Sequence, residues 1–286
     1  MAQLRDNSCE EPGHVMDLAA EYNNRALVPN HAEIIARWHR DAAAYRASHG
    51  GELDIPYGAR PRNRVDFFAG NGGGGQGPLI VFIHGGYWRS FDKSSFSHVA
   101  GPANAAGFDV AVPGYTLCPE VTLTDIIDEI RQCCLLLGQR TSRRLVLTGH
   151  SAGGHLAAAM AATEWAHYGA RPDLIQACLS VSGLFDLRPL MATAFNDDLR
   201  LSPVEAAAAS PLFWPMTNRV PFDSWVGAEE SFEFRRQARS LAAAWTGLGL
   251  PCRYEEVPGE NHFSIGDLLA RADHPMTLRL LELSRG

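Results

Sequence analysis

The sequence lacks long hydrophobic runs and clusters of positive charge. No apolar stretch approaches the ~20 residues that span a bilayer. Residues 1–11 are polar and include acids, so they do not predict a secretory signal peptide. Charged residues make up 20% of the 286 residues, and the formal net charge is −7. We therefore expect neither a membrane nor a nucleic acid as a partner.

Cysteine is also scarce, and its spacing does not indicate a metal site. The six cysteines are Cys9, Cys118, Cys133, Cys134, Cys178 and Cys252. None of them forms the paired motif of a zinc site, and no His, Asp and Glu cluster has ligand spacing. Several lie inside apolar segments, which is typical of small buried thiols. We expect reduced thiols, a cytoplasmic protein, and no metal or other cofactor.

Strand-like and helix-like segments alternate over most of the chain. Such alternation predicts a mostly parallel sheet covered by helices on both faces, and the length suits one α/β domain over residues 1–286. The predicted strands are 65–68, 79–84, 109–113, 145–148, 177–181, 222–226 and 253–257. The predicted helices between and after them are 94–106, 123–137, 151–167, 231–245 and a last one from 265 onward.

Three segments depart from this alternation. Residues up to about 50 predict an N-terminal helical segment that either covers the mouth of a site or braces the sheet. The glycine-rich stretch 70–77 lacks the spacing and flanks of a phosphate loop and predicts a flexible hairpin linker. Residues 187–218, rich in proline and aromatic side chains, predict a small cap over the sheet.

The segment Gly149-His-Ser-Ala-Gly153 lies between a predicted buried strand and a predicted helix. In a Gly-x-Ser-x-Gly turn the serine adopts a strained backbone that exposes its hydroxyl above the sheet edge. The flanking glycines allow the close backbone approach, and the turn leaves the N–H of Ala152 at the start of a helix. This context favours Ser151 as a nucleophile over a glycine- and serine-rich turn without chemistry.

A serine nucleophile needs a base, and the base needs a third group to orient it. His262 lies directly after a late predicted strand and before a helix, which makes it the candidate general base. The acid is expected at the end of the strand that lies between serine and histidine in chain order. We favour Glu230 there, with Glu229 and Asp186 as alternatives.

The segment His84-Gly-Gly-Tyr-Trp88 follows the first parallel strand. Its two glycines let the N–H groups of Gly85 and Gly86 approach an oxyanion together with that of Ala152. For His84 and His150, scaffolding of the serine turn is one interpretation. Tyr87 and Trp88 either contact the substrate or pack in the core. The candidate substrate-binding residues are Tyr87, Trp88, His150, Phe213 and Trp214.

These motifs resemble those of the arylformamidase (kynurenine formamidase) group of α/β-hydrolases, which is close to the hormone-sensitive-lipase-like esterases. The segments 182–189, 210–212, 233–237 and 261–264 agree with it, and the similarity runs from about Tyr57 to the last helix. The esterases usually carry a third glycine where this chain has Tyr87, which favours the formamidase side.

The resemblance implies the α/β-hydrolase fold and hydrolysis of N-formylkynurenine or a related N-acyl aromatic amine. It carries the serine to Ser151, the histidine to His262 and the acid to Glu230. Family members such as the animal enzymes have aspartate at that last position.

We therefore expect a cofactor-free serine hydrolase that cleaves a small acyl group, formyl or acetyl, from an aromatic amide through an acyl-enzyme on Ser151. A carboxylesterase for short-chain or aryl esters is the alternative enzyme. A catalytically silent ligand binder of the same fold is the alternative outside enzymes. The expected partner is a small aromatic amide or ester, and the sequence is compatible with a homodimer.

Overall fold

The computed structural model describes residues 16–72, 75, 77–216 and 218–286. The predictions for Cys9 and for the first residues of the N-terminal segment fall on 1–15, outside the described residues. Residues 73, 74 and 76 of the glycine-rich linker and residue 217 also lie outside them.

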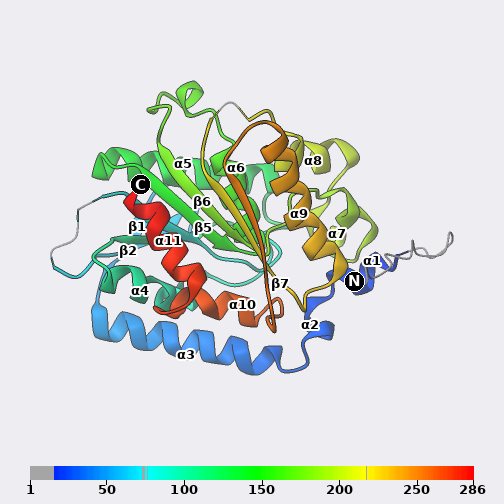
Figure 1. The fold of residues 1–286 in the computed structure, drawn as a ribbon, viewed down its shortest axis with the longest axis horizontal. Coiled ribbons are helices and arrows are strands. Elements are labelled where there is room, and N and C mark those ends of the chain that lie inside the picture. The colour runs from blue at the N-terminus through cyan, green and yellow to red at the C-terminus, as the bar shows by residue number, and fades with distance from the viewer. Residues whose placement is uncertain (1–15, 73–74, 76, 217) are drawn as a thin grey trace, which may run out of the picture.

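An eight-stranded sheet in the order β1-β2-β4-β3-β5-β6-β7-β8 forms the centre of the fold (Figure 1). The pairs β1–β2 and β2–β4 are antiparallel, and all other neighbours are parallel, as predicted. The strands are β1 Glu52–Pro56, β2 Arg64–Phe68, β3 Leu79–Ile83, β4 Val110–Pro113, β5 Leu145–His150, β6 Ile175–Val181, β7 Phe222–Gly227 and β8 Cys252–Val257.

Helices cover both faces of this sheet (Figure 1). In β3, Leu79, Val81 and Ile83 join the core with α5, α6 and α9, whereas Ile80 and Phe82 join the core with α3, α4 and α11. Successive side chains of a strand point to opposite faces, so one apolar run serves two cores. The helices are α1 Leu18–Tyr22, α2 Asn24–Leu27, α3 His31–His49, α4 Ala100–Ala105, α5 Leu123–Thr141, α6 Ala152–Ala161, α7 Asn196–Leu199, α8 Pro203–Ala208, α9 Phe232–Gly247, α10 Ser264–Asp267 and α11 Pro275–Arg285.

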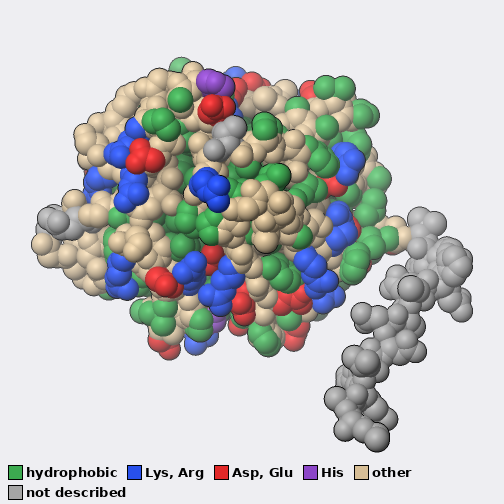
Figure 2. Space-filling view, turned by 45° about the horizontal axis from the view of Figure 1, so that its top comes forward, with side chains coloured by type: hydrophobic (Ala, Val, Ile, Leu, Met, Phe, Trp, Pro, Cys, Tyr) green, Lys and Arg blue, Asp and Glu red, His purple; other side chains and the backbone are tan. Residues whose placement is uncertain are grey.

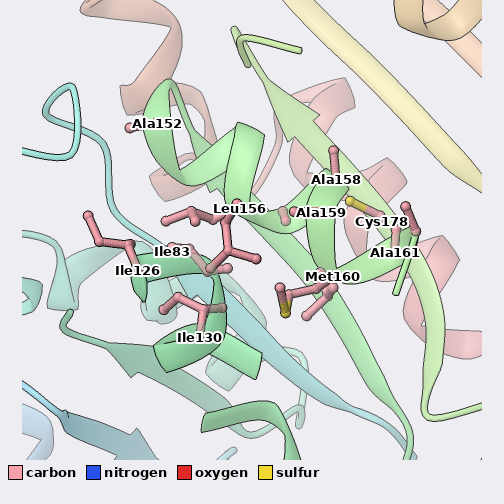
Figure 3. Packing of buried hydrophobic residues seen from close by; sticks show 14 of the residues in the cluster. Ile83, Ile126, Ile130, Ala152, Leu156, Ala158, Ala159, Met160, Ala161 and Cys178 are labelled. Atoms are coloured by element: carbon pink, nitrogen blue, oxygen red, sulfur yellow. The ribbon is translucent and has the colours of Figure 1, made fainter. Parts of the chain in front are cut away.

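α6 is buried along its whole length. Its alanines and glycines let it lie close to the sheet, and a Cβ on Gly154 would lie 2.6 Å from the Ser180 hydroxyl oxygen. Figure 3 shows Leu156 of α6 in the same cluster as Ile83 of β3 and Ile130 of α5. Burial of this helix fixes the position of the residue that precedes it, Ser151.

Several boundaries differ from the predicted ones. The helix predicted over 151–167 ends at Ala161, because the side chains of Thr163 and Trp165 donate hydrogen bonds to carbonyls of its last turn. The helix predicted over 94–106 is two short 3₁₀ turns followed by α4, which contains Gly101 and Pro102 in its first turn.

The predicted hairpin at 70–77 is wrong. This linker connects β2 to β3, and these strands are separated in the sheet by β4. The sequence pattern also does not indicate β1, because this edge strand buries only Ile55 among its five residues.

The N-terminal helical segment consists of α1, α2 and α3. Asn23 ends α1 and caps α2 through its side chain, and Pro29 lies between α2 and α3. Figure 1 shows α3 along one side of the molecule, and α1 lies against α9. Between Arg188 and Phe213 lie α7, α8 and short 3₁₀ turns.

The described helices include none that is both long enough and apolar enough to cross a membrane. On the face that Figure 2 shows, Lys and Arg side chains are interspersed with Asp and Glu side chains.

Candidate active site

The turn between β5 and α6 carries Ser151 at its apex. Its backbone has φ 57° and ψ −119°, a conformation that L-residues rarely adopt. Two close contacts explain the glycines on either side. A Cβ on Gly149 would lie 2.4 Å from the Gly153 carbonyl oxygen, and a Cβ on Gly153 would lie 1.9 Å from that of Ile83. No other residue type fits at these two positions without moving the backbone.

The structure brings Ser151, His262 and Glu230 together from the loops after β5, β8 and β7. Ser151 Oγ lies 3.1 Å from His262 Nε2, and His262 Nδ1 lies 2.7 Å from Glu230 Oε2. A carboxylate accepts, so Nδ1 carries the proton that it donates to Glu230. Nε2 is then free to accept the proton of the Ser151 hydroxyl, which is the arrangement needed to activate an alcohol.

Glu230 is held by further hydrogen bonds. Its side chain is fully buried, and its second oxygen, Oε1, accepts from the Gly227 N–H at 2.8 Å and from the Ser182 hydroxyl. The two alternative acids lie elsewhere. Glu229 is exposed, and Asp186 forms an ion pair with Arg188 at 2.8 Å. Only Glu230 of the three contacts His262.

The backbone of Gly85 lies directly against the serine. A Cβ on Gly85 would lie 3.1 Å from Ser151 Cβ and 2.7 Å from the His150 carbonyl oxygen. Gly86 has φ +114°, and a Cβ there would lie 2.3 Å from the Ser90 carbonyl oxygen. The N–H groups of Gly85, Gly86 and Ala152 donate no hydrogen bond to another described residue. Gly85 and Gly86 line the same cavity as Ser151, and Ala152 follows Ser151 in the chain, so these donors can bind an incoming oxygen atom.

Tyr87 occupies the position of the third glycine of the esterases and keeps a glycine-like backbone, with φ +49°. Its hydroxyl donates to the Tyr22 carbonyl at 2.7 Å, and its ring stacks on Phe195 with centroids 4.0 Å apart. These contacts compensate for a left-handed conformation that costs a non-glycine residue about 1 kcal/mol.

A cavity of about 340 Å³ opens onto Ser151 and His262. Its walls are mainly aromatic, which suits a planar apolar ligand. They come from the N-terminal segment, the segment after β3, the 187–218 segment and the loop after β8. The aromatic residues that line it are Trp38, Tyr87, Phe91, Phe96, Phe195 and Phe263.

Of the predicted substrate-binding residues, Tyr87 and His150 line this cavity and three others do not. Trp88 is fully buried, and its indole N–H donates to His155 Nδ1 at 3.2 Å. Phe213 lies on the surface under the Arg188 guanidinium, and the Trp214 indole N–H donates to the Ala208 carbonyl at 2.8 Å. The expectation that Trp88, Phe213 and Trp214 form walls is therefore wrong.

Sequence reasoning missed most of the true walls. Trp38 shares one buried face of α3 with Ile34, Ala42 and Tyr45, so periodicity identifies it as buried but not as facing a cavity. Phe195 comes from the predicted cap. The N-terminal segment both braces the sheet and contributes to the cavity, through Trp38 of α3, Asn24 and Arg25 of α2, and Asn23 between α1 and α2.

Three buried histidines surround the serine turn as neutral rings. Burial lowers the pKa of His84 to about 4, of His155 to about 4, and of His150 to about 3. His150 Nε2 donates to the His262 carbonyl at 2.8 Å, and the two rings are 4.8 Å apart. His84 stacks on Tyr115 with centroids 4.2 Å apart. His150 thus braces the loop that carries His262.

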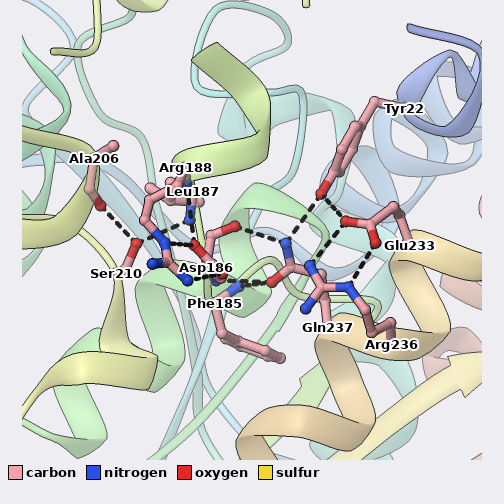
Figure 4. Close-up of polar contacts among 10 residues, drawn as sticks. All are labelled: Tyr22, Phe185, Asp186, Leu187, Arg188, Ala206, Ser210, Glu233, Arg236 and Gln237. Atoms are coloured by element: carbon pink, nitrogen blue, oxygen red, sulfur yellow. Dashed lines mark hydrogen bonds and ion pairs between the residues drawn. The ribbon is translucent and has the colours of Figure 1, made fainter. Parts of the chain in front are cut away.

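A polar network fastens α1 to the rest of the site (Figure 4). The Tyr22 hydroxyl donates to Glu233 at 2.7 Å and accepts from the Gln237 amide at 3.1 Å. The Gln237 oxygen accepts from the N–H groups of Phe185 and Asp186 at 2.8 and 2.7 Å. Desolvation opposes the charge of Glu233, yet its hydrogen bonds to Arg236 and Tyr22 hold its pKa below the usual value. Asp186 is therefore part of the hydrogen-bond network that holds α1 in place.

Among the described residues, no three His, Cys, Asp or Glu side chains are grouped as a metal ion would require. The five described cysteines have free thiols, and four of them are buried.

Comparisons with known proteins agree with this architecture. Residues 80–265 match the family described as alpha/beta hydrolase fold. The chain is 31% identical to the kynurenine formamidase of Danio rerio over 238 residues, which is 81% of each protein. The solved structure of a proposed thioesterase from Silicibacter sp. TM1040 has a TM-score of 0.83 and 32% identity, over 95% of this chain and 100% of that one. An esterase from Pyrobaculum calidifontis shares the fold, with a TM-score of 0.69 at 17% identity over 92% and 96% of the two chains.

The neutral histidines predict how stability depends on pH. Their pKa values fall from 6.5 to between about 3 and 4 on folding, so between pH 6.5 and about 4 mainly the unfolded chain takes up these protons. Their contribution is constant above pH 6.5, and the protein loses stability as the pH falls toward 4, by about 1.4 kcal/mol per pH unit for each histidine. Urea unfolding between pH 7 and 5 gives the slope of the unfolding free energy against pH. This slope should be smaller in the His155→Gln variant than in the wild type, by the equivalent of one proton. A His155→Gln variant with the wild-type slope would contradict the assignment.

Proposed function

Because the chain belongs to the kynurenine formamidase family of α/β-hydrolase enzymes, we propose that it is an arylformamidase. It removes a formyl or another small acyl group from an aromatic amide, and N-formylkynurenine is the substrate that its relatives point to. The observation that carries the proposal is the hydrogen-bonded series from Ser151 through His262 to Glu230 at the base of an aromatic cavity.

Acylation begins when the Ser151 oxygen attacks the amide carbonyl carbon and His262 Nε2 takes the hydroxyl proton. Glu230 stabilises the imidazolium that results. The carbonyl oxygen becomes negatively charged, and the N–H groups of Gly85, Gly86 and Ala152 are the donors that would bind it. His262 then gives its proton to the leaving nitrogen, and the aromatic amine departs.

Deacylation repeats these roles with water. His262 takes a proton from a water molecule, which attacks the acyl carbon and releases the carboxylic acid, formate in the case of a formyl group. A formyl group needs little space beside the serine, whereas the aromatic amine needs a wide apolar wall, which the cavity offers.

Hydrolysis of esters or thioesters by the same residues is a second candidate. It is favoured by the name of the Silicibacter relative, a proposed thioesterase at 32% identity. The nitrogen of an amide must be protonated before it can leave, whereas the oxygen or sulfur of an ester or thioester depends less on protonation. A formamidase with this triad would therefore also hydrolyse activated esters.

We also propose that the protein acts on a small aromatic amide or ester and binds neither nucleic acid nor a membrane. We propose the cytoplasm as its location. Support for a reducing compartment comes from the buried free thiols of Cys133, Cys134 and Cys178. Burial raises the pKa of each of these thiols well above its usual value, so they have little thiolate character.

Replacing the nucleophile tests the mechanism. Ser151→Ala should lower kcat by about 10⁴-fold or more while leaving the fold intact, since only the oxyanion donors and binding remain. Steady-state kinetics and circular dichroism check both points. A fluorophosphonate probe should label the wild type and not the variant. Near-normal turnover by Ser151→Ala would end the mechanism.

The acid is tested by a matched pair of isosteric variants. Glu230→Gln should lower kcat by about 10³–10⁴-fold, because the neutral amide no longer stabilises the imidazolium or its tautomer. Asp186→Asn should keep kcat within a few-fold, because Asp186 contacts Arg188 and not His262. The reverse order of effects would move the acid to Asp186.

The substrate class is tested by comparing kcat/KM for N-formylkynurenine and p-nitrophenyl acetate. A formamidase should process the amide at least as efficiently as this activated ester, although the amide is intrinsically far less reactive. A kcat/KM for the amide that is indistinguishable from background, with rapid ester turnover, would assign the chain to the esterases.

A further inference from the structure

The active-site cavity is lined by positive charge and by no negative charge. Two side chains that line it are permanently charged, Arg25 and Arg89, and both are positive. No aspartate or glutamate is among the lining residues, because Glu230 lies behind His262. An aromatic cavity for a neutral ligand does not require a cation at its wall.

The two arginines differ in their surroundings. Arg89 forms an ion pair with Asp198, and its guanidinium lies 4.9 Å from the centroid of the Phe195 ring. Its charge is thus compensated, and it serves as part of the wall. Arg25 is exposed on α2 and forms no ion pair with any acid in the described part of the chain. None of its five N–H donors makes a hydrogen bond to a described residue, so all five can bind a ligand.

The helix that carries Arg25 is anchored beside the reacting atoms. The neighbouring side chain, Asn24, is buried and donates to the Tyr87 hydroxyl at 3.4 Å. That hydroxyl donates in turn to the Tyr22 carbonyl at 2.7 Å. Because Tyr87 directly follows Gly86, these contacts fix α2 relative to the oxyanion donors. Arg25 therefore occupies a defined place at the cavity wall.

We propose that Arg25 forms an anion-binding subsite that selects aromatic amides carrying a carboxylate. The inference rests on the proposed function and deepens it. A guanidinium binds a carboxylate through two parallel N–H···O hydrogen bonds, which fix orientation as well as charge. With the acyl group at Ser151 and the ring between the aromatic walls, the carboxylate is held on α2. Arg25 is a specificity-determining residue and takes no part in proton transfer.

The test measures binding separately from turnover. In the full-length Ser151→Ala background, calorimetry gives Kd for N-formylkynurenine and for its carboxamide, which has the same shape without the negative charge. The acid should bind about tenfold more tightly than the carboxamide, the size of a charge-assisted contact at a partly exposed site. Adding Arg25→Gln should remove this ratio by weakening the acid alone. Arg25→Lys should retain part of it.

Two further variants sharpen the comparison. Asp198→Asn releases Arg89 from its partner and should tighten binding of the acid but not of the carboxamide. Arg40→Gln removes an exposed arginine of α3 that pairs with Asp41 and does not line the cavity, so it should leave both Kd values unchanged. Raising the salt concentration should weaken binding of the acid only when Arg25 is present.

An equal effect of Arg25→Gln on both ligands, no effect on either, or equal affinities before the substitution would overturn the subsite. Turnover by the protein with Ser151 intact decides a separate question. If it hydrolyses neither amide, the formamidase proposal fails, whereas an Arg25-dependent difference in Kd still establishes the anion subsite.

Discussion

The approach of α6 to the end of β3 is the constraint on which the site depends. The backbone at Gly153 comes so close to the Ile83 carbonyl that even a methyl group would collide with it. This contact sets the angle at which β5 turns into α6 and forces Ser151 into its strained conformation. The burial of α6 between the sheet and α5 supplies the packing energy that holds the strain. The hydroxyl therefore stays in place before any ligand arrives.

Glu230, the proposed triad acid, shows how a longer side chain is accommodated. Glutamate carries one methylene more than the aspartate expected from the family, so its carboxylate reaches farther from the backbone. The backbone of Glu260 excludes a side chain at Gly227, since a Cβ there would lie 2.2 Å from the Glu260 carbonyl oxygen, and the same Cβ would also lie 3.2 Å from Glu230 Oε1. The Gly227 N–H and the Ser182 hydroxyl then hold that oxygen, while the other faces His262. The substitution changes the reach of the acid and keeps its direction.

The sequence predicts those parts of the structure that depend on neighbouring residues. Seven of the strands and the serine turn follow from apolar runs and glycine spacing, and the order of loops along the chain placed His262 and Glu230 near Ser151. The cavity walls depend instead on which distant segments meet. Trp38, Trp88 and Trp214 have the same side chain, yet only Trp38 lines the cavity. The difference arises because α3 crosses the molecule beside the cavity, and its path cannot be read from the local sequence. The hairpin at 70–77 failed for the same reason, since β4 enters between its strands from later in the chain.

The cavity is built from both ends of the polypeptide. Its wall includes Arg25 near the start, its nucleophile stands near the middle, and His262 arrives with the loop after the last strand. During translation the serine turn can form once β6 has left the ribosome, but the base is missing until β8 and the residues after it have emerged. From the addition of Ser151 until the loop after β8 is in place, a nascent chain thus carries an inert alcohol, and hydrolytic competence appears only when the C-terminal segment docks.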